Sequence, residues 1–355
     1  MATDRLSALD DNLLCSHILS KLSLPHAIRC SLLSRRWRYL WIVLPHIKIS
    51  SPCFKGKVLD HMMLFHSGPL ESFELSFTDS YGIDNNTNAK LFWRWLCFAS
   101  AKKVKEITLK NCFNSFTLSL MYLPTSLFSC DCLTFLKLEY FDFREIPAYS
   151  FGGFKCLRTC FLSRLHTTDA ILDYLVTRCP LLENLTVQNC NGLNNTKISA
   201  VNLKKLDFTD NNRPSSLTLN CPQLMRIEVQ GFHPISRLEL NCCGSLHLST
   251  AQIHLLEGIS NRNLLRKLTL RRFSRYLSSL TVLNSFPNLE ELFIENISPS
   301  EDFFSISHLE GLSFEELLQE SFSFFTPEEL SMQVNSFSNL EEPSMENEHL
   351  KVSSF

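Results

Sequence analysis

The apolar residues near the start of the chain recur with a helical period. Leu14, Ile18 and Leu22 lie four residues apart, and their neighbours widen the apolar stripe. This pattern predicts an amphipathic helix over residues 11–21. One of the two adjacent aspartates at its start is the expected cap, because a carboxylate there accepts a hydrogen bond from a free backbone N–H group.

Two further short helices are expected before residue 45. Pro25 suits the first turn of one of them, since the N–H group that proline lacks is not needed there. Ser34 is a natural cap for the other, whose apolar face carries Trp37 and Leu40. Three short helices in about forty residues bury little apolar surface on their own. Part of this surface must therefore be covered, either by the next domain or by another protein.

A leucine pair, Leu13-Leu14, precedes the run Leu33-Ser-Arg-Arg-Trp-Arg-Tyr-Leu-Trp41 in this segment. In this combination, residues 5–45 resemble the F-box of plant F-box/leucine-rich-repeat proteins. The resemblance implies binding to a Skp-type adaptor and, through it, to cullin and RING subunits. One departure is that the proline of the family's opening Leu-Pro is Asp10 here.

The resemblance also implies which apolar residues face the adaptor. Some of them could instead form the core of the module, and the sequence does not separate the two roles. The expected adaptor-binding residues are Leu9, Leu13, Leu14, Ile18, Leu22, Leu33 and Trp37.

Behind this segment, short units of the form Leu-x-x-Leu-x-Leu recur. Ten of them begin between Leu70 and Leu289, and most successive units are 19–29 residues apart. This spacing is typical of leucine-rich repeats, in which each unit contributes one short strand. Since one strand cannot bury its apolar face alone, we expect the strands to stack into a solenoid with a curved parallel sheet. The predicted fold class is α/β, a small three-helix F-box followed by this solenoid.

Signals between the strands agree with a repeat architecture. Thr168-Asp169 is expected to cap a helix over residues 170–178, and additional strands are expected near residues 217–219 and 238–240. Asn-Cys pairs follow four of the strands, and we expect their buried Asn side chains to bond the backbone where each coil bends. The pairs are Asn111-Cys112, Asn189-Cys190, Asn220-Cys221 and Asn241-Cys242.

The charge of the chain changes towards its end. Residues 298–355 carry twelve acids, one base and eight phenylalanines, whereas the remaining residues carry a net charge of about +9. A partly disordered acidic tail with an amphipathic helix near residues 312–325 is expected. The predicted domains are the F-box at 1–49, a linker leading into the solenoid at 50–69, leucine-rich repeats at 70–297 and an acidic Phe-rich tail at 298–355.

Candidate catalytic chemistry is sparse. The fourteen cysteines are scattered without zinc spacing, and the chain has no Gly-rich phosphate loop and no hydrolase motif. We therefore predict no catalytic residue, no cofactor and no metal site, and we expect a non-enzymatic protein. A net charge of −2 does not indicate a nucleic-acid partner, and no apolar run indicates a membrane partner. Unpaired thiols and a start without an apolar signal segment predict a cytoplasmic or nuclear protein.

A basic cluster near the last repeats has two interpretations. Arg266, Lys267 and Arg271 lie around one expected strand. They could simply form a solvated strand face. Alternatively, they form a substrate-binding surface for an acidic protein segment, and the acidic tail is the nearest candidate for such a segment.

Together, these patterns predict the substrate-recognition subunit of an SCF-type cullin-RING ubiquitin ligase. The F-box would hold the adaptor and the repeats would hold an unidentified protein substrate, so the chain would supply effective concentration and not chemistry. One alternative is a non-ligase scaffold whose F-box is degenerate. Another is a ligand-gated receptor with a small-molecule pocket.

Overall fold

A computed structural model describes most of the chain up to residue 307. The described residues are 6, 8–50, 63–78, 85–112, 121–123, 125–145, 151–212, 214–230, 237–240, 245–249, 259, 262–271, 286–295 and 303–307. The chain divides into two compact units, residues 1–307 and residues 308–355. All described residues belong to the first unit. The helix expected near residues 312–325 lies outside the described residues.

The first forty-odd residues form three short helical segments, as expected. The first is α1 (Asp11–Leu13), a π-helical turn η1 (Leu14–Ile18) and the 3-10 turn η2 (Leu19–Lys21); the second is α2 (Leu24–Arg29) and η3 (Cys30–Leu32); the third is η4 (Trp37–Val43). Asp10 caps the first, because its carboxylate accepts a hydrogen bond from the Asn12 N–H group at 3.3 Å. Pro25 occupies the first turn of α2.

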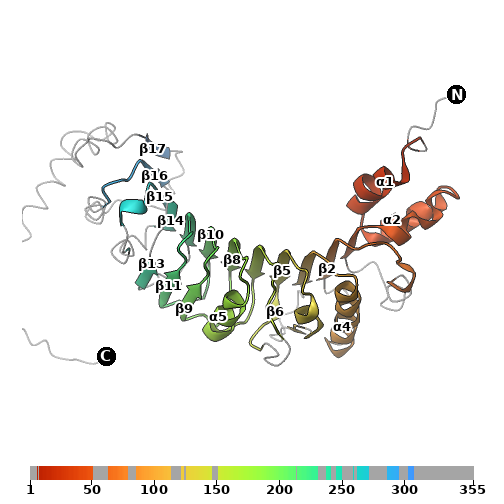
Figure 1. The fold of residues 1–355 in the computed structure, drawn as a ribbon, viewed down its shortest axis with the longest axis horizontal. Helices are drawn as coiled ribbons and strands as arrows, with labels where there is room; N and C mark the ends of the chain where they lie inside the picture. The colour runs from red at the N-terminus through yellow and green to blue at the C-terminus, as the bar shows by residue number, and fades with distance from the viewer. Residues whose placement is uncertain are drawn as a thin grey trace, which may run out of the picture. The chain divides into compact units, whose positions relative to one another are not determined.

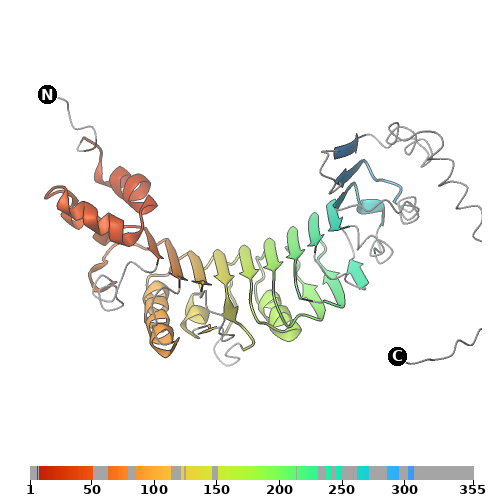
Figure 2. The same ribbon diagram turned by 180° about the vertical axis from the view of Figure 1, so that it is seen from behind.

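A twelve-stranded sheet forms the main layer of the repeats. Its strands, in order, are β1 (His46–Ser50), β2 (Ser72–Thr78), β3 (Glu106–Cys112), β5 (Phe135–Glu139), β7 (Thr159–Ser163), β8 (Asn184–Gln188), β10 (Lys205–Thr209), β12 (Arg226–Gln230), β14 (Ser245–Ser249), β15 (Lys267–Arg271), β16 (Glu291–Glu295) and β17 (Phe303–Ser307). All neighbouring strands are parallel except β16 and β17. Figures 1 and 2 show the strands following one another along an arc, which confirms the predicted curved parallel sheet.

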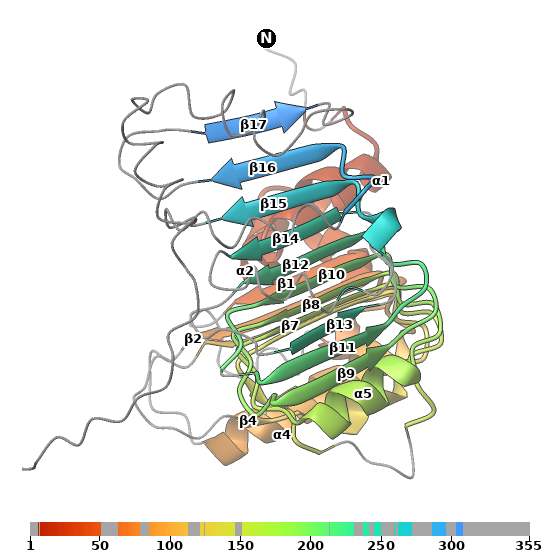
Figure 3. The same cartoon turned by 90° about the vertical axis from the view of Figure 1, so that its left-hand side faces the viewer.

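The other elements lie on the outer side of this sheet. A second, three-stranded parallel sheet contains β9 (Asn195–Ser199), β11 (Ser216–Asn220) and β13 (Arg237–Leu240). The helices are α4 (Asn85–Ala101) and α5 (Asp169–Thr177), with the 3-10 turns η5 (Thr125–Ser129) and η7 (Arg262–Leu264), and β4 (Met121–Tyr122) pairs with β6 (Phe141–Asp142). Figure 3 shows the second sheet, α4 and α5 below the main sheet.

The core lies between these two layers. Along each central strand, buried residues alternate with partly exposed ones, as a half-buried strand requires. Leu136 and Leu138 of β5, for example, are buried, whereas Lys137 between them is partly exposed. On the helical side, Phe128, Phe151 and their neighbours fill the space with stacked and edge-to-face rings.

Several elements differ from the expectations. The main sheet begins at β1, which overlaps the end of the segment assigned to the F-box, and it ends with β17, within the predicted tail. The strand β9 was also not expected. The expected outer strands near residues 217–219 and 238–240 are present as β11 and β13.

The predicted burial of the asparagine side chains in the Asn-Cys pairs holds at one position and is wrong at two others. Asn111 is buried, and its amide donates a hydrogen bond to the Tyr140 carbonyl at 3.2 Å. Asn189 and Asn220 are not buried. In the coil of Asn189, the bonding role belongs to the buried Asn211 amide, which accepts from the Cys190 N–H group and donates to the Val187 carbonyl, both at 2.9 Å.

The fourth pair, Asn241-Cys242, lies outside the described residues.

Four consecutive strands end in the same backbone turn. The residues that follow β5, β7, β8 and β10 have positive φ angles of 64°, 52°, 53° and 51°. They are Tyr140, Arg164, Asn189 and Asp210. A left-handed residue redirects the chain sharply, so each of these coils leaves the sheet with the same local geometry.

The F-box is joined to the first repeat by buried polar contacts. The His66 ring donates from Nε2 to the Leu44 carbonyl at 2.9 Å and packs edge-on against Phe98. Lys102 donates to the carbonyls of His66 and Gly68 at 3.1 and 3.2 Å. Burial lowers the pKa of His66, and the backbone bond to Leu44 partly offsets this effect. These contacts fix the segment after the F-box against α4.

In the described part of the chain, no helix is long and apolar enough to cross a membrane. Within the same residues, His, Cys, Asp and Glu side chains do not come together in threes in a way that could hold a metal ion.

Candidate protein-binding sites

The F-box contains a small but complete core. Leu14, Leu19, Ala27, Trp37 and Leu40 are buried and come from all three helical segments. The amphipathic pattern of the first helix and the Trp37 face of the third explain this packing, because each places apolar residues on one side. Leu13, Leu32 and Leu33 remain outside this core.

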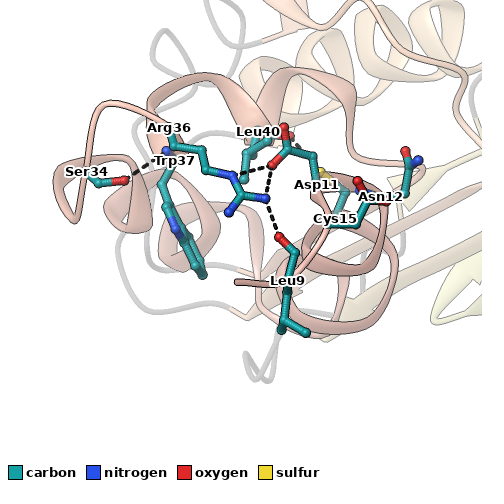
Figure 4. Close-up of polar contacts among 9 residues, drawn as sticks. Leu9, Asp11, Asn12, Cys15, Ser34, Arg36, Trp37 and Leu40 are labelled. Atoms are coloured by element: carbon teal, nitrogen blue, oxygen red, sulfur yellow. Dashed lines mark hydrogen bonds and ion pairs between the residues drawn. The ribbon is translucent and has the colours of Figure 1, made fainter. Parts of the chain in front are cut away.

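An arginine holds the first and third helical segments of the F-box together. The Arg36 side chain lies 2.7 Å from a carboxylate oxygen of Asp11 and also donates to the Leu9 carbonyl. Trp37, next to it, donates its backbone N–H group to the Ser34 hydroxyl at 3.4 Å. Figure 4 shows the Arg36 side chain reaching Asp11 and Leu9 at the start of the first helix, with the Ser34 contact to one side.

The seven residues expected to bind the adaptor separate into three groups. Leu14 and Trp37 lie in the core, with 0% and 6% of their surface exposed. Leu9, Ile18 and Leu22 are partly exposed. Leu13 and Leu33 are 46% and 69% exposed, so they are the ones whose side chains lie open to solvent. Direct adaptor contact by these residues stays a prediction.

Four exposed large apolar residues of this segment were missing from the expected set: Leu6, Leu32, Tyr39 and Val43. Leu32 is 86% exposed and Tyr39 is 64% exposed. Leu32 lies next to Leu33, and only the position of this pair just before Ser34 could have indicated it. Exposed large apolar residues are individually common, but this many on so small a module indicate an interaction surface.

Charged side chains form a row at the start of the repeat strands. Seven strands, β2, β3, β7, β8, β10, β15 and β16, each have a charged residue directly before them. These residues are, in the same order, Glu71, Lys105, Arg158, Glu183, Lys204, Arg266 and Glu290. Neighbours in this row pair with opposite sign: Glu71 with Lys105 at 3.5 Å, Glu183 with Lys204 at 2.9 Å and with Arg158, and Arg266 with Glu290. The two bases lower the pKa of Glu183.

The row accounts for one member of the predicted basic surface. Arg266 is ion-paired with Glu290, so its charge already has a partner within the repeats. Lys267 is exposed at the start of β15, and the side chain of Arg271 lies outside the described residues. A substrate-binding role for Arg266, Lys267 and Arg271 stays a prediction.

The inner face of the central strands carries a shallow depression with mixed chemistry. Phe161 of β7 packs against Phe135 with ring centroids 5.6 Å apart, and Lys137 lies 5.9 Å from the centre of the Phe161 ring. Arg164 pairs with Glu139 at 3.0 Å and covers the Tyr140 ring. The depression is lined by Lys137, Glu139, Phe161, Ser163, Arg164, Thr186, Gln188 and Asn189. Sequence periodicity predicted that these strand residues point outward, but it did not single them out.

The buried cysteines are poorly suited to nucleophilic chemistry. Burial raises the pKa of Cys130, Cys179 and Cys190 to about 11 and also raises the pKa of Cys160. A thiol with such a pKa is protonated at neutral pH, whereas the thiolate is the reactive form. These residues therefore serve the packing of the repeats.

A helical module with exposed leucines, joined to stacked parallel strands, defines the class of F-box proteins with leucine-rich repeats. The comparisons agree. The F-box domain profile matches residues 9–45, and the profile "FBD-associated F-box protein At5g56370, LRR repeats" matches residues 92–242. The chain belongs to the F-box/leucine-rich-repeat family.

Its relatives include several proteins of Arabidopsis thaliana. F-box/FBD/LRR-repeat protein At2g04230 is 31% identical over 79% of this chain and 65% of its own length. F-box/FBD/LRR-repeat protein At1g13570 is 30% identical over 64% and 54%, and F-box/LRR-repeat protein At3g26922 is 28% identical over 80% and 94%. The chain thus spans between about half and two thirds of the length of the first two relatives. F-box domains in general imply binding to a Skp-type adaptor, and proteins of this kind are typically non-catalytic adaptors.

Proposed function

We propose that this protein is the substrate-recognition subunit of an SCF-type cullin-RING ubiquitin ligase. The F-box would bind a Skp-type adaptor, and the adaptor would connect the chain to cullin and RING subunits. The inner face of the repeats would hold a protein substrate. Cytoplasm or nucleus is the compartment that this role requires.

One observation carries the adaptor assignment. Leu13, Leu32 and Leu33 are exposed although the core of the module is complete without them. Covering the side chain of one leucine is worth roughly 1.5–3 kcal/mol, so a partner that covers three of them gains substantial affinity. The substrate assignment is supported by the long inner sheet face, whose strand residues are partly exposed and chemically varied.

The chain itself would contribute position and not chemistry. Holding a substrate near a recruited ubiquitin-carrying enzyme raises the effective concentration of the substrate lysines. The raised pKa values of the buried thiols fit this non-catalytic role. A non-ligase scaffold that uses only its repeats is the second candidate, because Asp10 replaces the family's proline at the start of the F-box.

The test measures adaptor binding by calorimetry with the full chain. Leu32→Ala together with Leu33→Ala should weaken binding by tenfold or more without altering the thermal unfolding of the chain, because both side chains are exposed. Val201→Ala, at a similarly exposed apolar position in the repeats, is the matched control and should have no effect. An intact wild-type chain that binds no Skp-type adaptor would reject the ligase role in favour of the scaffold.

A further inference from the structure

The middle residues of five neighbouring strands form one row across the inner sheet face. Lys137 of β5, Phe161 of β7, Thr186 of β8, Asp207 of β10 and Glu228 of β12 are paired with one another in register. All five are partly exposed, between buried residues of the same strands. Along this row the side chains change from basic (Lys137) through uncharged (Phe161 and Thr186) to acidic (Asp207 and Glu228).

The basic end of the row is available to a ligand. The neighbouring acid, Glu139, is paired with Arg164. Among the ion pairs of the described residues, none involves Lys137, whose ammonium group lies 5.9 Å from the centre of the Phe161 ring. Lys137 and Phe161 both line the depression on this face. A carboxylate placed there would gain an ion pair that the folded chain does not itself supply.

The acidic end of the row contains one carboxylate oxygen without a hydrogen-bond partner. Oxygen Oδ1 of Asp207 is shielded from solvent and has no hydrogen-bond partner. Its in-register neighbour is a second acid, Glu228, whose carboxylate lies 3.6 Å from Arg226. Burial and Glu228 raise the pKa of Asp207, and its bond with Thr209 offsets this only in part. A positively charged group placed over Asp207 and Glu228 would stabilise the ionised form of this carboxylate.

We propose that the row from Lys137 to Asp207 binds an extended peptide segment of a protein partner, with an acidic residue over Lys137, an apolar residue over Phe161 and Thr186, and a basic residue over Asp207 and Glu228. This inference rests on the proposed function, because it names the class of segment that the repeats would hold. The segment crosses the strands, since the row itself runs across them.

The geometry of the sheet sets the spacing of the segment. The strands β5 and β10 are three steps apart, and at ~4.8 Å for each step this separates Lys137 from Asp207 by about 14 Å. An extended chain rises about 3.3 Å per residue, so the acid and the base should be about four residues apart. Side chains alternate along an extended chain, so residues i, i+2 and i+4 all face the sheet. The apolar residue at i+2 then lies over β7 and β8.

The mixed charge of the row argues against a polyanion as the occupant. Asp207 and Glu228 at one end of the row would repel a run of phosphates that Lys137 attracts at the other end. A segment that carries both signs satisfies both ends, and one with the reversed order can still bind by running in the opposite direction.

The experiment uses the full chain co-purified with a Skp-type adaptor and a set of synthetic nine-residue peptides. Each peptide carries one Glu, one Arg and a Leu midway between them, with the Glu–Arg spacing varied from about two to six residues and in both orders. Fluorescence anisotropy of labelled peptides gives the affinities. The tightest binding is expected at a spacing of four, and roughly five- to tenfold weaker binding is expected at two and six.

Charge substitutions locate the binding on the row. Lys137→Glu should weaken the best peptide about fivefold or more and should strengthen a peptide whose Glu is replaced by Arg, a gain that misfolding cannot produce. Asp207→Asn should weaken binding of the Arg end in the same manner. Lys197→Glu is the matched control, because it makes the same charge change at an exposed position of β9 in the outer sheet.

The outcomes separate the two proposals. Suppose that the adaptor co-purifies but peptide affinity does not depend on the Glu–Arg spacing, or depends on it in Lys137→Glu and Asp207→Asn just as in the wild type. This result overturns the peptide inference alone. Spacing-dependent binding that responds to these substitutions in a chain that retains no adaptor supports the peptide row and rejects the ligase role.

Discussion

The guanidinium group of Arg36 lies 2.7 Å from the carboxylate of Asp11, although the two residues are 25 positions apart in the chain. The same side chain donates to the Leu9 carbonyl. Arg36 therefore ties the start of the first helical segment to the start of the third, in a module whose core is small. Its neighbour Arg35 is also exposed, so the two arginines can be compared directly.

Arg36→Ala is expected to loosen the start of the F-box, and Arg35→Ala is not. Losing one exposed ion pair and one backbone contact should cost about 1 kcal/mol, because partly exposed charges are screened by solvent. Hydrogen exchange of the amides in residues 11–21 is the measurement. Equal exchange rates in the two variants would show that the Arg36 contacts do not hold the helix.

Asp10→Pro is expected to leave the fold intact and to strengthen adaptor binding. Asp10 has a φ angle of −64°, which is the angle that proline fixes. The substitution loses the capping bond to Asn12 but also reduces the freedom of the unfolded chain, so the net change in stability should stay within about 1 kcal/mol. Calorimetry with a Skp-type adaptor measures the gain.

Asp10→Ala is the control for that substitution. It removes the same cap without adding the ring, and it should destabilise the first helix by about 1 kcal/mol. If both variants bind the adaptor as the wild type does, the position is neutral for binding.

Gly153→Ala is expected to destabilise the repeats, whereas Gly152→Ala is nearly neutral. Gly153 has a φ angle of +94°, and an added Cβ atom would overlap the carbonyl oxygen of Arg178. Nothing lies within 4 Å of a Cβ atom added at Gly152. The strained backbone alone costs roughly 1–2 kcal/mol, and the overlap adds to it. Urea unfolding of the two variants compares them, and equal midpoints would contradict the expectation.

The stability of the junction between the F-box and the repeats is expected to fall in mildly acidic solution. The folded pKa of His66 lies below its ordinary value of 6.5. Above about pH 6.5 the His66 ring is mostly neutral in both the folded and the unfolded chain. Below this pH the unfolded chain binds a proton at His66, whereas the folded chain does not until the pH reaches the lower folded pKa. The free energy of unfolding should therefore decrease as the pH falls from 6.5 through the folded pKa.

His66→Gln should remove this part of the pH dependence. His26→Gln, at an exposed position, is the control and should keep it. Urea midpoints at several pH values between about 7.5 and 5 provide the comparison. A pH dependence that is identical in all three proteins would place the titrating group elsewhere.

The repeat architecture was predictable from sequence because its signal is local. Pairs such as Leu136 and Leu138 alternate with polar residues and recur at a near-constant spacing, and both are buried as expected. Strands with a less apolar pattern were not predicted from the sequence. In β9 the inward positions are Thr196 and Ile198, and a buried threonine does not register as an apolar position.

The candidate site was less predictable, because exposure depends on tertiary packing. Trp37 and Leu33 both fit the family pattern, yet Trp37 fills the core and Leu33 is open to solvent. Periodicity identifies an apolar face but not what covers it. The inner row was likewise invisible, because it depends on which residues of separate coils meet in register, as Lys137 and Phe161 do.

The left-handed residue after each central strand has a consequence for how this surface can vary. Since Tyr140, Arg164, Asn189 and Asp210 return the chain to the outer side in the same way, coils of different length still deliver their next strand in register. The backbone thus keeps the outward strand positions at fixed places relative to one another. Substitution of a single outward residue, such as Phe161 or Thr186, can change what is recognised without moving any neighbouring strand.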